Sequence, residues 1–222
     1  MCSTSIIRHE VVVLFYKYFV EDSISNQATK EILLFLEELT KKLGMKGRVL
    51  LAEEGINGTL SSPTMSDMEV FIHEMETYQI TPSKTLFTNM DWKLSSIDST
   101  DSQSQPFPDL KLSLVKEIVS TGGVITVDEI SKFGGKHLSP EEFHQCLLDA
   151  WSDEVPLEGD GRSAKRKEVV VIDVRNTFEH AIGHFQTAKR RAMNPKMVTF
   201  SEFDTKFCAE QSEYLKDKKV LM

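Results

Sequence analysis

The sequence contains little cysteine, no long run of hydrophobic residues and no excess of positive charge. Its three cysteines, Cys2, Cys146 and Cys208, are scattered and odd in number, which predicts neither a disulfide framework nor a zinc site. No apolar run is long enough to cross a bilayer, and the start MCSTSIIRHE is not typical of a secretory signal. The net charge of −8 argues against a protein that coats nucleic acid non-specifically. Together these absences favour a reducing, cytoplasmic environment.

The composition that remains is that of an ordinary globular protein. With 222 residues, of which 40% are hydrophobic, the chain is long enough for two domains of modest size, each with its own core. The length and composition therefore predict two successive domains along the chain.

The first half alternates strand and helix patterns. The β-branched and aromatic stretch Val11–Phe19 predicts a strand, and apolar residues at helical spacing predict a helix from Ser25 to Leu43. Two strands, Gly47–Glu53 and Ile56–Ser61, a helix after Pro63 and a strand within Thr85–Ile97 complete the series. The order βαββαβ predicts an α/β (α+β) fold in which residues 1–98 form a ferredoxin-like domain of the acylphosphatase-like kind.

The segment GINGT, residues 55–59, admits two interpretations. Glycine and asparagine tolerate positive φ, so the favoured interpretation is a tight turn. The alternative is that the backbone approaches a phosphate or a base, with Asn57 and Thr59 as hydrogen-bond donors. Five residues are the candidates for RNA binding: Arg48, Asn57, Thr59, Lys111 and Lys116. Scattered lysines are more often solvated surface than binding groups.

Residues 99–167 are predicted to connect the domains and to contain one strand and one helix. Leu110–Thr121 begins with alternating apolar and polar residues, which favours a strand. Ser139-Pro-Glu-Glu142 is typical of a helix start, with Ser139 as the cap. The basic cluster between Arg162 and Lys167 is predicted to be a soluble linker, with RNA contact as the alternative.

The stretch Val169–Phe185, VVVIDVRNTFEHAIGHF, predicts a buried strand, a turn, a short helix and a Gly-His exit. Arg175 and Glu179 are four residues apart and can pair across a turn, while Asp173 can accept backbone N–H bonds. We favour a structural role for Asp173, Arg175 and Glu179 over direct catalysis. His180 and His184 have the spacing of a metal-binding pair, but Gly183 interrupts the helix and no third ligand is evident, so we expect no metal.

Two blocks of sequence resemble one known family. The first is Arg48–Leu60, RVLLAEEGINGTL, together with Pro106–Gly122, which contains KEIV; the second is the Asp-x-Arg-Asn stretch followed by Met193-Asn194-Pro195 and Phe200–Phe203. The combination resembles the rhodanese-like tRNA uridine hydroxylases and their eukaryotic relatives, the thiosulfate sulfurtransferase/rhodanese-like domain-containing proteins of the second type. The resemblance implies an acylphosphatase-like domain followed by a rhodanese-like domain from residue 168 to 222, with tRNA as partner and no cofactor. It also implies hydroxylation of the wobble uridine at C5.

The sequence departs from that family at its nucleophile. Family members carry a reactive cysteine in a loop after the strand that corresponds to Lys219–Met222, KVLM, and the sequence ends there. A rhodanese nucleophile needs the cysteine, inward-pointing N–H groups and a helix N-terminus together. Cys146 and Cys208 are predicted to be small hydrophobic residues of helices. We therefore expect a truncated rhodanese-like domain, no catalytic residue within the chain, and a nucleophile beyond Met222.

Three functions stay open at this point. The first is hydroxylation of tRNA uridine by the full-length protein, with this chain inactive by itself. The second is sulfur transfer through a cysteine persulfide in the full-length protein. The third is a non-catalytic module that binds RNA or protein. We expect no membrane association, and the sequence leaves the oligomeric state open.

Overall fold

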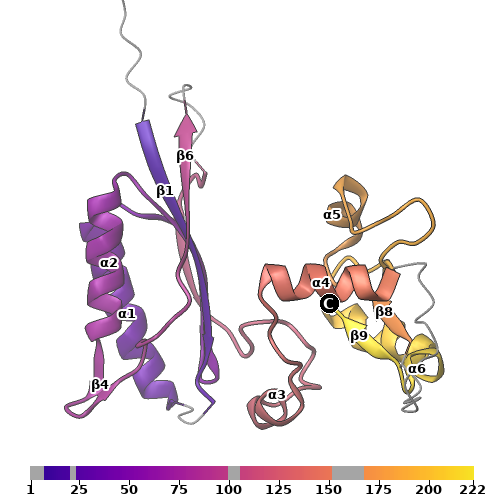
Figure 1. Ribbon diagram of the computed structural model, residues 1–222. Helices are drawn as coiled ribbons and strands as arrows, with labels where there is room; N and C mark the ends of the chain where they lie inside the picture. Colours follow the sequence, from indigo (N-terminus) through magenta and orange to yellow (C-terminus); the bar gives the residue numbers. More distant parts are fainter. Residues whose placement is uncertain (1–7, 21–23, 100–105, 152–167) are drawn as a thin grey trace, which may run out of the picture. The chain divides into compact units, whose positions relative to one another are not determined.

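The computed structural model describes residues 8–20, 24–99, 106–151 and 168–222 of the chain. The chain divides into two compact units (Figure 1). Residues 1–119 with 125–132 form the first, which we call unit 1, and residues 120–124 with 133–222 form the second, unit 2. Within the described residues, no helix has the length and hydrophobicity needed to span a bilayer.

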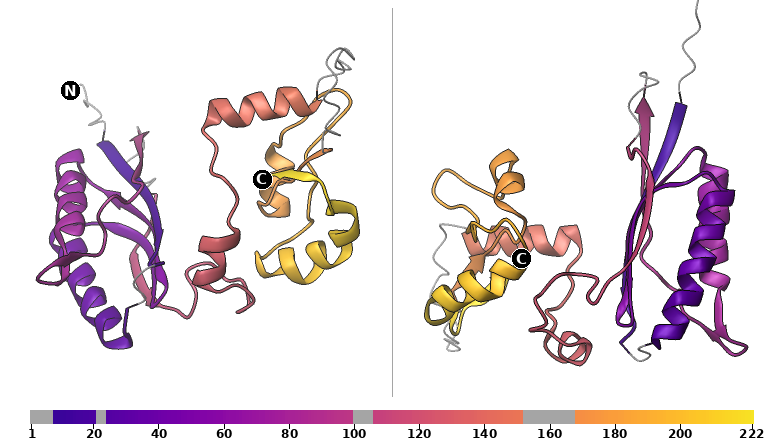
Figure 2. Two further views of the ribbon diagram at one scale, coloured as in Figure 1. Left: turned by 60° about the horizontal axis from the view of Figure 1, so that its bottom comes forward. Right: turned by 180° about the vertical axis from the view of Figure 1, so that it is seen from behind.

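Unit 1 is a five-stranded sheet with two helices on one face. The strand order is β6-β1-β3-β2-β7, in which the first four strands are antiparallel neighbours and β7 joins β2 in parallel. Both helices, α1 and α2, lie on the same side of the sheet in every view (Figures 1 and 2). The elements are β1 Arg8–Tyr18, α1 Asn26–Lys42, β2 Lys46–Ala52, β3 Gly55–Ser62, α2 Met65–Thr77, β6 Lys93–Ser99 and β7 Leu110–Leu114. This is the predicted ferredoxin-like fold with one added strand.

Helix α1 begins and ends where the sequence indicates. The Ser25 hydroxyl accepts a hydrogen bond from the backbone N–H of Ala28 at 3.2 Å, which satisfies one of the open donors of the first turn. Gly44 follows the last turn with φ of +62°, a conformation that side chains disfavour. The predicted helix from Ser25 to Leu43 is therefore confirmed to within one residue at each end.

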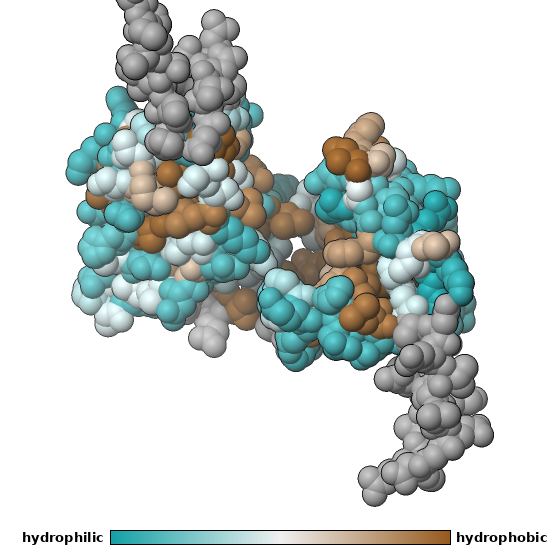
Figure 3. Space-filling view, turned by 45° about the horizontal axis from the view of Figure 1, so that its top comes forward, coloured by the Kyte–Doolittle hydropathy of each residue, from teal (hydrophilic) through white to brown (hydrophobic). Residues whose placement is uncertain are grey.

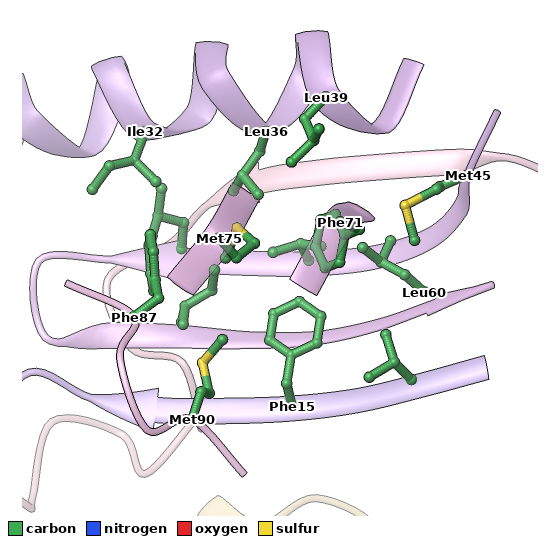
Figure 4. Close-up of a cluster of buried hydrophobic side chains, with 14 of the residues drawn as sticks. Phe15, Ile32, Leu36, Leu39, Met45, Leu60, Phe71, Met75, Phe87 and Met90 are labelled. Atoms are coloured by element: carbon green, nitrogen blue, oxygen red, sulfur yellow. The ribbon is translucent and has the colours of Figure 1, made fainter. Parts of the chain in front are cut away.

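The core of unit 1 lies between the helices and the covered face of the sheet (Figure 4). Alternate residues of β1, namely Val11, Val13 and Phe15, point to this side, as period-two patterning requires. The fully buried side chains that meet them include Ile32, Leu36, Leu51, Ile56, Leu60, Met68, Phe71, Met75 and Phe87.

Two predicted strands are shorter than expected. Thr85–Ile97 is not one strand: a small hairpin of β4 Gln79–Thr81 and β5 Lys84–Thr85 comes first, and β6 begins only at Lys93. Asn89 between them has φ of +57°, which interrupts the extended chain and lets Phe87 and Met90 enter the core. The predicted strand Leu110–Thr121 stops at Leu114, where its pairing with β2 ends.

The strand that we had placed in the connecting region belongs to the sheet of unit 1. Leu110 and Leu112 of β7 pack against the core, which explains the alternation that the sequence shows there. Helix α3, Val127–Phe133, was not predicted, whereas α4, Pro140–Trp151, starts at the expected Ser139 cap. The domain boundaries of residues 98 and 167 stay a prediction.

Unit 2 contains a small parallel sheet with helices on both faces. Strand β8 Val169–Val171 pairs in parallel with β9 Lys219–Leu221, and Ile172 forms a parallel bridge to Met193 on the other side. Val171 and Leu221 pack on α4, whereas Val170 and Ile172 pack on Phe207 of the following helical segment. The remaining elements are the short helix α5 Thr177–Ile182, the π-helical turn Phe203–Cys208 and α6 Ala209–Leu215. Burial on both faces explains the unbroken apolar run of β8.

Hydrophobic side chains also reach the surface of unit 2. In the space-filling view, hydrophobic residues lie among hydrophilic ones, and apolar surface is visible where α5 projects (Figure 3). Phe178 and Ile182 of α5 are 69% and 90% exposed. Helix α5 is short, and only one of its sides faces the rest of unit 2. His180 is buried on that side, so Phe178 and Ile182 are left exposed.

Candidate functional site

Asp173 is the centre of a polar network at the carboxyl end of β8. Its carboxylate accepts hydrogen bonds from Arg175 Nε at 2.9 Å, Arg175 Nη2 at 2.8 Å and the Arg175 backbone N–H at 3.2 Å. His180 Nδ1 lies 3.0 Å from the second carboxylate oxygen. The Asp173 side chain is only 7% exposed, so these donors replace the water that the carboxylate has lost. The network holds the turn after β8 in one conformation.

The surroundings of Asp173 keep it ionised. Hydrogen bonds from the Arg175 guanidinium lower the pKa of the Asp173 carboxyl to about 2, with smaller contributions from the Arg175 backbone and His180, against the opposing effect of burial. The same contact raises the pKa of Arg175. Asp173 is therefore a fixed negative charge at neutral pH, which suits an orienting group better than a proton donor.

Glu179 does not pair with Arg175 in the way we predicted. It completes a capping box at the start of α5, where the Asn176 side chain accepts from the N–H groups of Phe178 and Glu179 and the Glu179 carboxylate accepts from the N–H of Asn176. Arg175 instead reaches Asp173 and donates to the Gly183 carbonyl at 2.5 Å. Arg175 pairs with Asp173, two residues before it, and not with Glu179, four residues after it. Arg175 lies in a turn and not in a helix, so its side chain does not point along the helical i to i+4 direction.

His180 and His184 form a stacked pair rather than two arms of a metal site. Their rings are 4.0 Å apart and nearly parallel. His180 Nδ1 faces a carboxylate and His184 Nδ1 faces the His180 carbonyl at 2.9 Å, so each Nδ1 carries the hydrogen. His184 Nε2 is buried without a protein partner. The described residues hold no group of three or more His, Cys, Asp or Glu placed to bind one metal ion.

A cavity opens beside this network, at the carboxyl ends of the parallel strands. It encloses about 540 Å³ and is lined by Asp173, Arg175, His184, Phe143 and Met222, among others. Ligands of open parallel sheets bind outside the carboxyl ends of the strands, where backbone groups and loop residues converge. The sequence indicated Asp173 and Arg175 for this place. It gave no sign that Phe143 of α4 and His184 would join them, because those contacts depend on how the helices pack on the sheet.

The two cysteines of the described residues are packed against apolar clusters. Cys146 of α4 lies beside the cluster of Leu147 and Val171, and Cys208 beside that of Val170 and Phe207. Burial raises the pKa of the Cys208 thiol, and the nearby carboxylate of Asp204 raises it further. Both effects disfavour the thiolate, which is the reactive form. Cys2 lies outside the described residues.

We predict that Cys208 reacts slowly with alkylating reagents. At neutral pH, iodoacetamide should modify it on the order of tenfold more slowly than N-acetylcysteine, because less thiolate is present and the sulfur is partly covered. Peptide mass spectrometry over time measures the rate, and the same chain unfolded in urea is the control, in which the difference should vanish. Faster modification of the folded chain would show that Cys208 is an activated thiol.

The glycines of GINGT serve a strand and not a turn. A tight turn is present, but Glu53 and Glu54 form it, just before Gly55. Gly55 and Gly58 both lie in β3 and neither has a positive φ, so the prediction that the turn requires these glycines is wrong. A Cβ on Gly58 would lie 2.4 Å from Cζ of Phe15, and one on Gly55 would lie 2.4 Å from the carbonyl oxygen of Lys17. Glycine is required because neighbouring groups approach the backbone closely.

Asn57 and Glu54 join the two sequence blocks of unit 1 to each other. The Asn57 side-chain amide donates to the Ile118 carbonyl at 3.1 Å, and the Ile118 N–H donates to the Glu54 carboxylate at 2.8 Å. Ile118 is almost fully buried and packs over Gly55. The GINGT and KEIV segments, 60 residues apart in the sequence, are thus parts of one structural feature. Asn57 uses its amide N–H for this contact.

The other candidate RNA-binding residues lie on or near the face of the sheet that the helices leave open. Arg48, Thr59 and Lys111 are register partners on β2, β3 and β7. Arg48 forms an ion pair with Asp109 and donates to the Asp109 carbonyl at 2.8 Å. Lys111 and Lys116 are exposed. The basic cluster Arg162–Lys167 lies outside the described residues.

Comparison with known proteins accounts for both units. Residues 10–118 match the family described as "UPF0176 acylphosphatase like domain". The chain is 28% identical over 214 residues to the tRNA uridine(34) hydroxylase of Aster yellows witches'-broom phytoplasma, covering 95% of this chain and 56% of that protein. Residues 10–118 thus form a domain of this acylphosphatase-like family, and the chain as a whole is similar to tRNA uridine(34) hydroxylases. Predictions from the two sequence blocks and from the βαββαβ order are thereby confirmed.

Two further relatives show a similar degree of sequence identity. The tRNA uridine(34) hydroxylase of Corynebacterium aurimucosum is 32% identical over 193 residues, which are 86% of this chain and 52% of that protein. Rhodanese-like domain-containing protein 6 of Arabidopsis thaliana is 30% identical over 217 residues, or 95% of this chain and 33% of that protein. The chain therefore spans about half the length of the bacterial relatives and a third of the plant protein.

Proposed function

We propose that the protein to which this chain belongs modifies tRNA in the cytoplasm by placing a hydroxyl group on C5 of the wobble uridine. The observation that carries the proposal is the similarity to tRNA uridine(34) hydroxylases over 95% of the chain, which spans both units. The geometry supports it. Asp173 and Arg175 stand at the carboxyl end of a parallel strand pair, beside a cavity, and the ferredoxin-like unit has an open sheet face.

The two units have different roles in this proposal. Asp173 and Arg175 hold the turn after β8, and the Arg175 side chain is about half exposed at the cavity. Cys208 packs among apolar side chains and nothing there favours the thiolate, so it does not act as the nucleophile. Cys146 is half-buried beside Leu147, with Lys219 Nζ 3.7 Å from its Sγ, and the proposal assigns it no chemical role. Unit 1 contributes RNA binding.

The test is the modification state of tRNA in cells that lack the gene. We expect 5-hydroxylated uridine at position 34 to disappear from the mass spectrum of purified tRNA and to return on complementation with the full gene. A gene with Cys146→Ser and Cys208→Ser should complement equally well. Unchanged tRNA in the deletion would contradict the proposal.

Two further measurements separate the alternatives. Transfer of sulfur from thiosulfate to cyanide by the full-length protein, with tRNA unchanged in the deletion, would favour a sulfurtransferase. Binding of tRNA with no modification in either experiment would favour a non-catalytic RNA-binding module.

A further inference from the structure

The face of the unit 1 sheet that α1 and α2 leave open carries a continuous row of side chains across all five strands. The register places Lys93, Leu14, Thr59, Arg48 and Lys111 side by side, on β6, β1, β3, β2 and β7 in turn. With strands about 4.8 Å apart, this row is about 19 Å long. The five residues come from four distant parts of the sequence, and only the strand order brings them together.

Aromatic and aliphatic groups lie next to this row. Tyr16 stands two residues along β1 from Leu14, on the same face, and its register partner on β3 is Asn57. The Tyr16 side chain is 50% exposed, and Leu14 and Ile97 are 41% and 37% exposed. An exposed tyrosine on an open sheet face presents a flat apolar surface with a polar edge, to which a planar partner can stack.

Positive charge borders this aromatic centre on both sides. Lys93 lies at the β6 edge with its Nζ 6.0 Å from the centre of the Tyr16 ring, and Lys111 lies exposed at the β7 edge. Lys93 is paired with Asp91 at 3.6 Å, but both side chains are more than half exposed, and such a pair is weak enough for a phosphate to displace Asp91. Arg48 is held by both the carboxylate and the carbonyl of Asp109, so Lys111 and Lys93 are the lysines that a ligand can meet. The chain as a whole is acidic, with a net charge of −8, whereas this face has lysines at both edges. The positive charge at the edges favours an anionic partner.

We propose that this open face binds a single-stranded RNA loop, with a base stacked on Tyr16 and phosphates near Lys93 and Lys111. Sheets of four strands with exposed aromatic residues hold two or three stacked bases, and a row of about 19 Å accommodates that number. An RNA loop suits the face better than a duplex, because the bases of a duplex are already stacked. The inference rests on the proposed function for the choice of RNA and goes beyond it in naming the surface.

The stacking arm of the test compares two tyrosines. Fluorescence anisotropy measures binding of the 222-residue chain to a fluorescein-labelled anticodon stem-loop containing uridine 34. Tyr16→Ala should weaken binding on the order of tenfold, whereas Tyr16→Phe should bind nearly as well as the original chain. Tyr214→Ala is the matched control, because Tyr214 is 47% exposed and also has a lysine, Lys218, over its ring. It should leave binding unchanged.

The charge arm uses the salt dependence of the same binding. Lys93→Glu and Lys111→Glu should each weaken binding and reduce the slope of log affinity against log salt by about 0.7, the value for one phosphate contact on a single strand. Lys30→Glu makes the same charge change on the exposed side of α1, away from the open face, and should leave the slope nearly as it is. Circular dichroism confirms that the variants are folded.

The outcomes distinguish this inference from the proposed function. If the original chain binds the stem-loop and Tyr16→Ala binds as well as Tyr214→Ala, the RNA does not use the open face, although the proposed function stands. If deletion of the gene leaves tRNA unchanged, the proposed function fails, whatever the anisotropy shows. If Tyr16→Ala abolishes self-association in analytical ultracentrifugation and has no effect on RNA binding, the face is an interface between copies of the chain, and the inference is overturned.

Discussion

Replacing Gly58 with alanine is expected to lower the free energy of unfolding of unit 1 by about 3 kcal/mol, at the upper end of the cost of overfilling a core. The three atoms nearest to an added Cβ all belong to the Phe15 ring, at 2.4, 2.8 and 2.9 Å. Phe15 is fully buried, and its ring centre lies 5.1 Å from that of Trp92 and 6.0 Å from that of Phe71. The ring therefore has no free space into which it can move.

Urea unfolding followed by tryptophan fluorescence measures this effect. Trp92 reports on unit 1 because it contacts Phe15, and Trp151→Phe removes the only other tryptophan. Gly135→Ala is the matched control, since a Cβ there would have no heavy atom within 4 Å, and it should change the unfolding midpoint little.

A second substitution tests the cause of the instability. If the collision with Phe15 is responsible, Phe15→Leu with Gly58→Ala should be less destabilised than the sum of the two single variants. Strict additivity, or equal midpoints for Gly58→Ala and Gly135→Ala, would show that the requirement for glycine has another origin.

Removing the Asp173 carboxylate is expected to destabilise unit 2 by about 3 kcal/mol in Asp173→Ala. The loss leaves the buried His180 Nδ1–H without its acceptor and frees the Arg175 side chain that also holds Gly183. Asp173→Asn keeps one acceptor oxygen and should cost about half as much. Hydrogen exchange of peptides that cover residues 168–176 measures the effect, with Glu213→Gln, an exposed carboxylate of α6, as the control.

The contribution of Asp173 should also depend on pH in a defined direction. The pKa of its carboxyl in the folded chain is about 2, below its ordinary value of 3.8. The stabilisation is therefore complete above about pH 4 and disappears as the pH falls toward 2, with a size of about 2 kcal/mol. The difference in exchange between the original chain and Asp173→Asn should narrow over this range. A difference that stays constant would contradict the role of the charged carboxylate.

The prediction of the fold from the sequence succeeded where local patterns decide it. The helix from Ser25 to Leu43 has a cap, an apolar stripe and a terminal glycine, all of which act within one or two turns of the chain. The unbroken apolar run of β8 indicated a buried strand, and the structure buries it on both faces. The prediction failed at Thr85–Ile97, where side chains of Phe87 and Met90 enter the core at the expense of a regular strand.

In the candidate sites, too, local contacts could be predicted from the sequence and contacts made by tertiary packing could not. Asp173 and Arg175 were identified from the sequence by their local Asp-x-Arg pattern, although Arg175 was predicted to pair with Glu179 and not with Asp173. Their partner His180 and the wall formed by Phe143 were not, because α5 and α4 reach them only through packing on the sheet. GINGT was assigned to a turn because the sequence does not show whether a glycine is needed for a positive φ or for the close approach of a neighbouring group. At Gly58 the position of the Phe15 ring shows that close approach is the reason.

The sequence by itself determined the order of the main elements of unit 1, the resemblance to the tRNA uridine hydroxylases and the Asp-x-Arg turn, since each depends on patterns that are local in the chain. Only the tertiary structure decided that β7 joins the sheet, that Asn57 holds Ile118, and that Lys93, Leu14, Thr59, Arg48 and Lys111 form one row. Those contacts join residues that are far apart in the sequence, and strand register, which no single strand specifies, determines which of them meet.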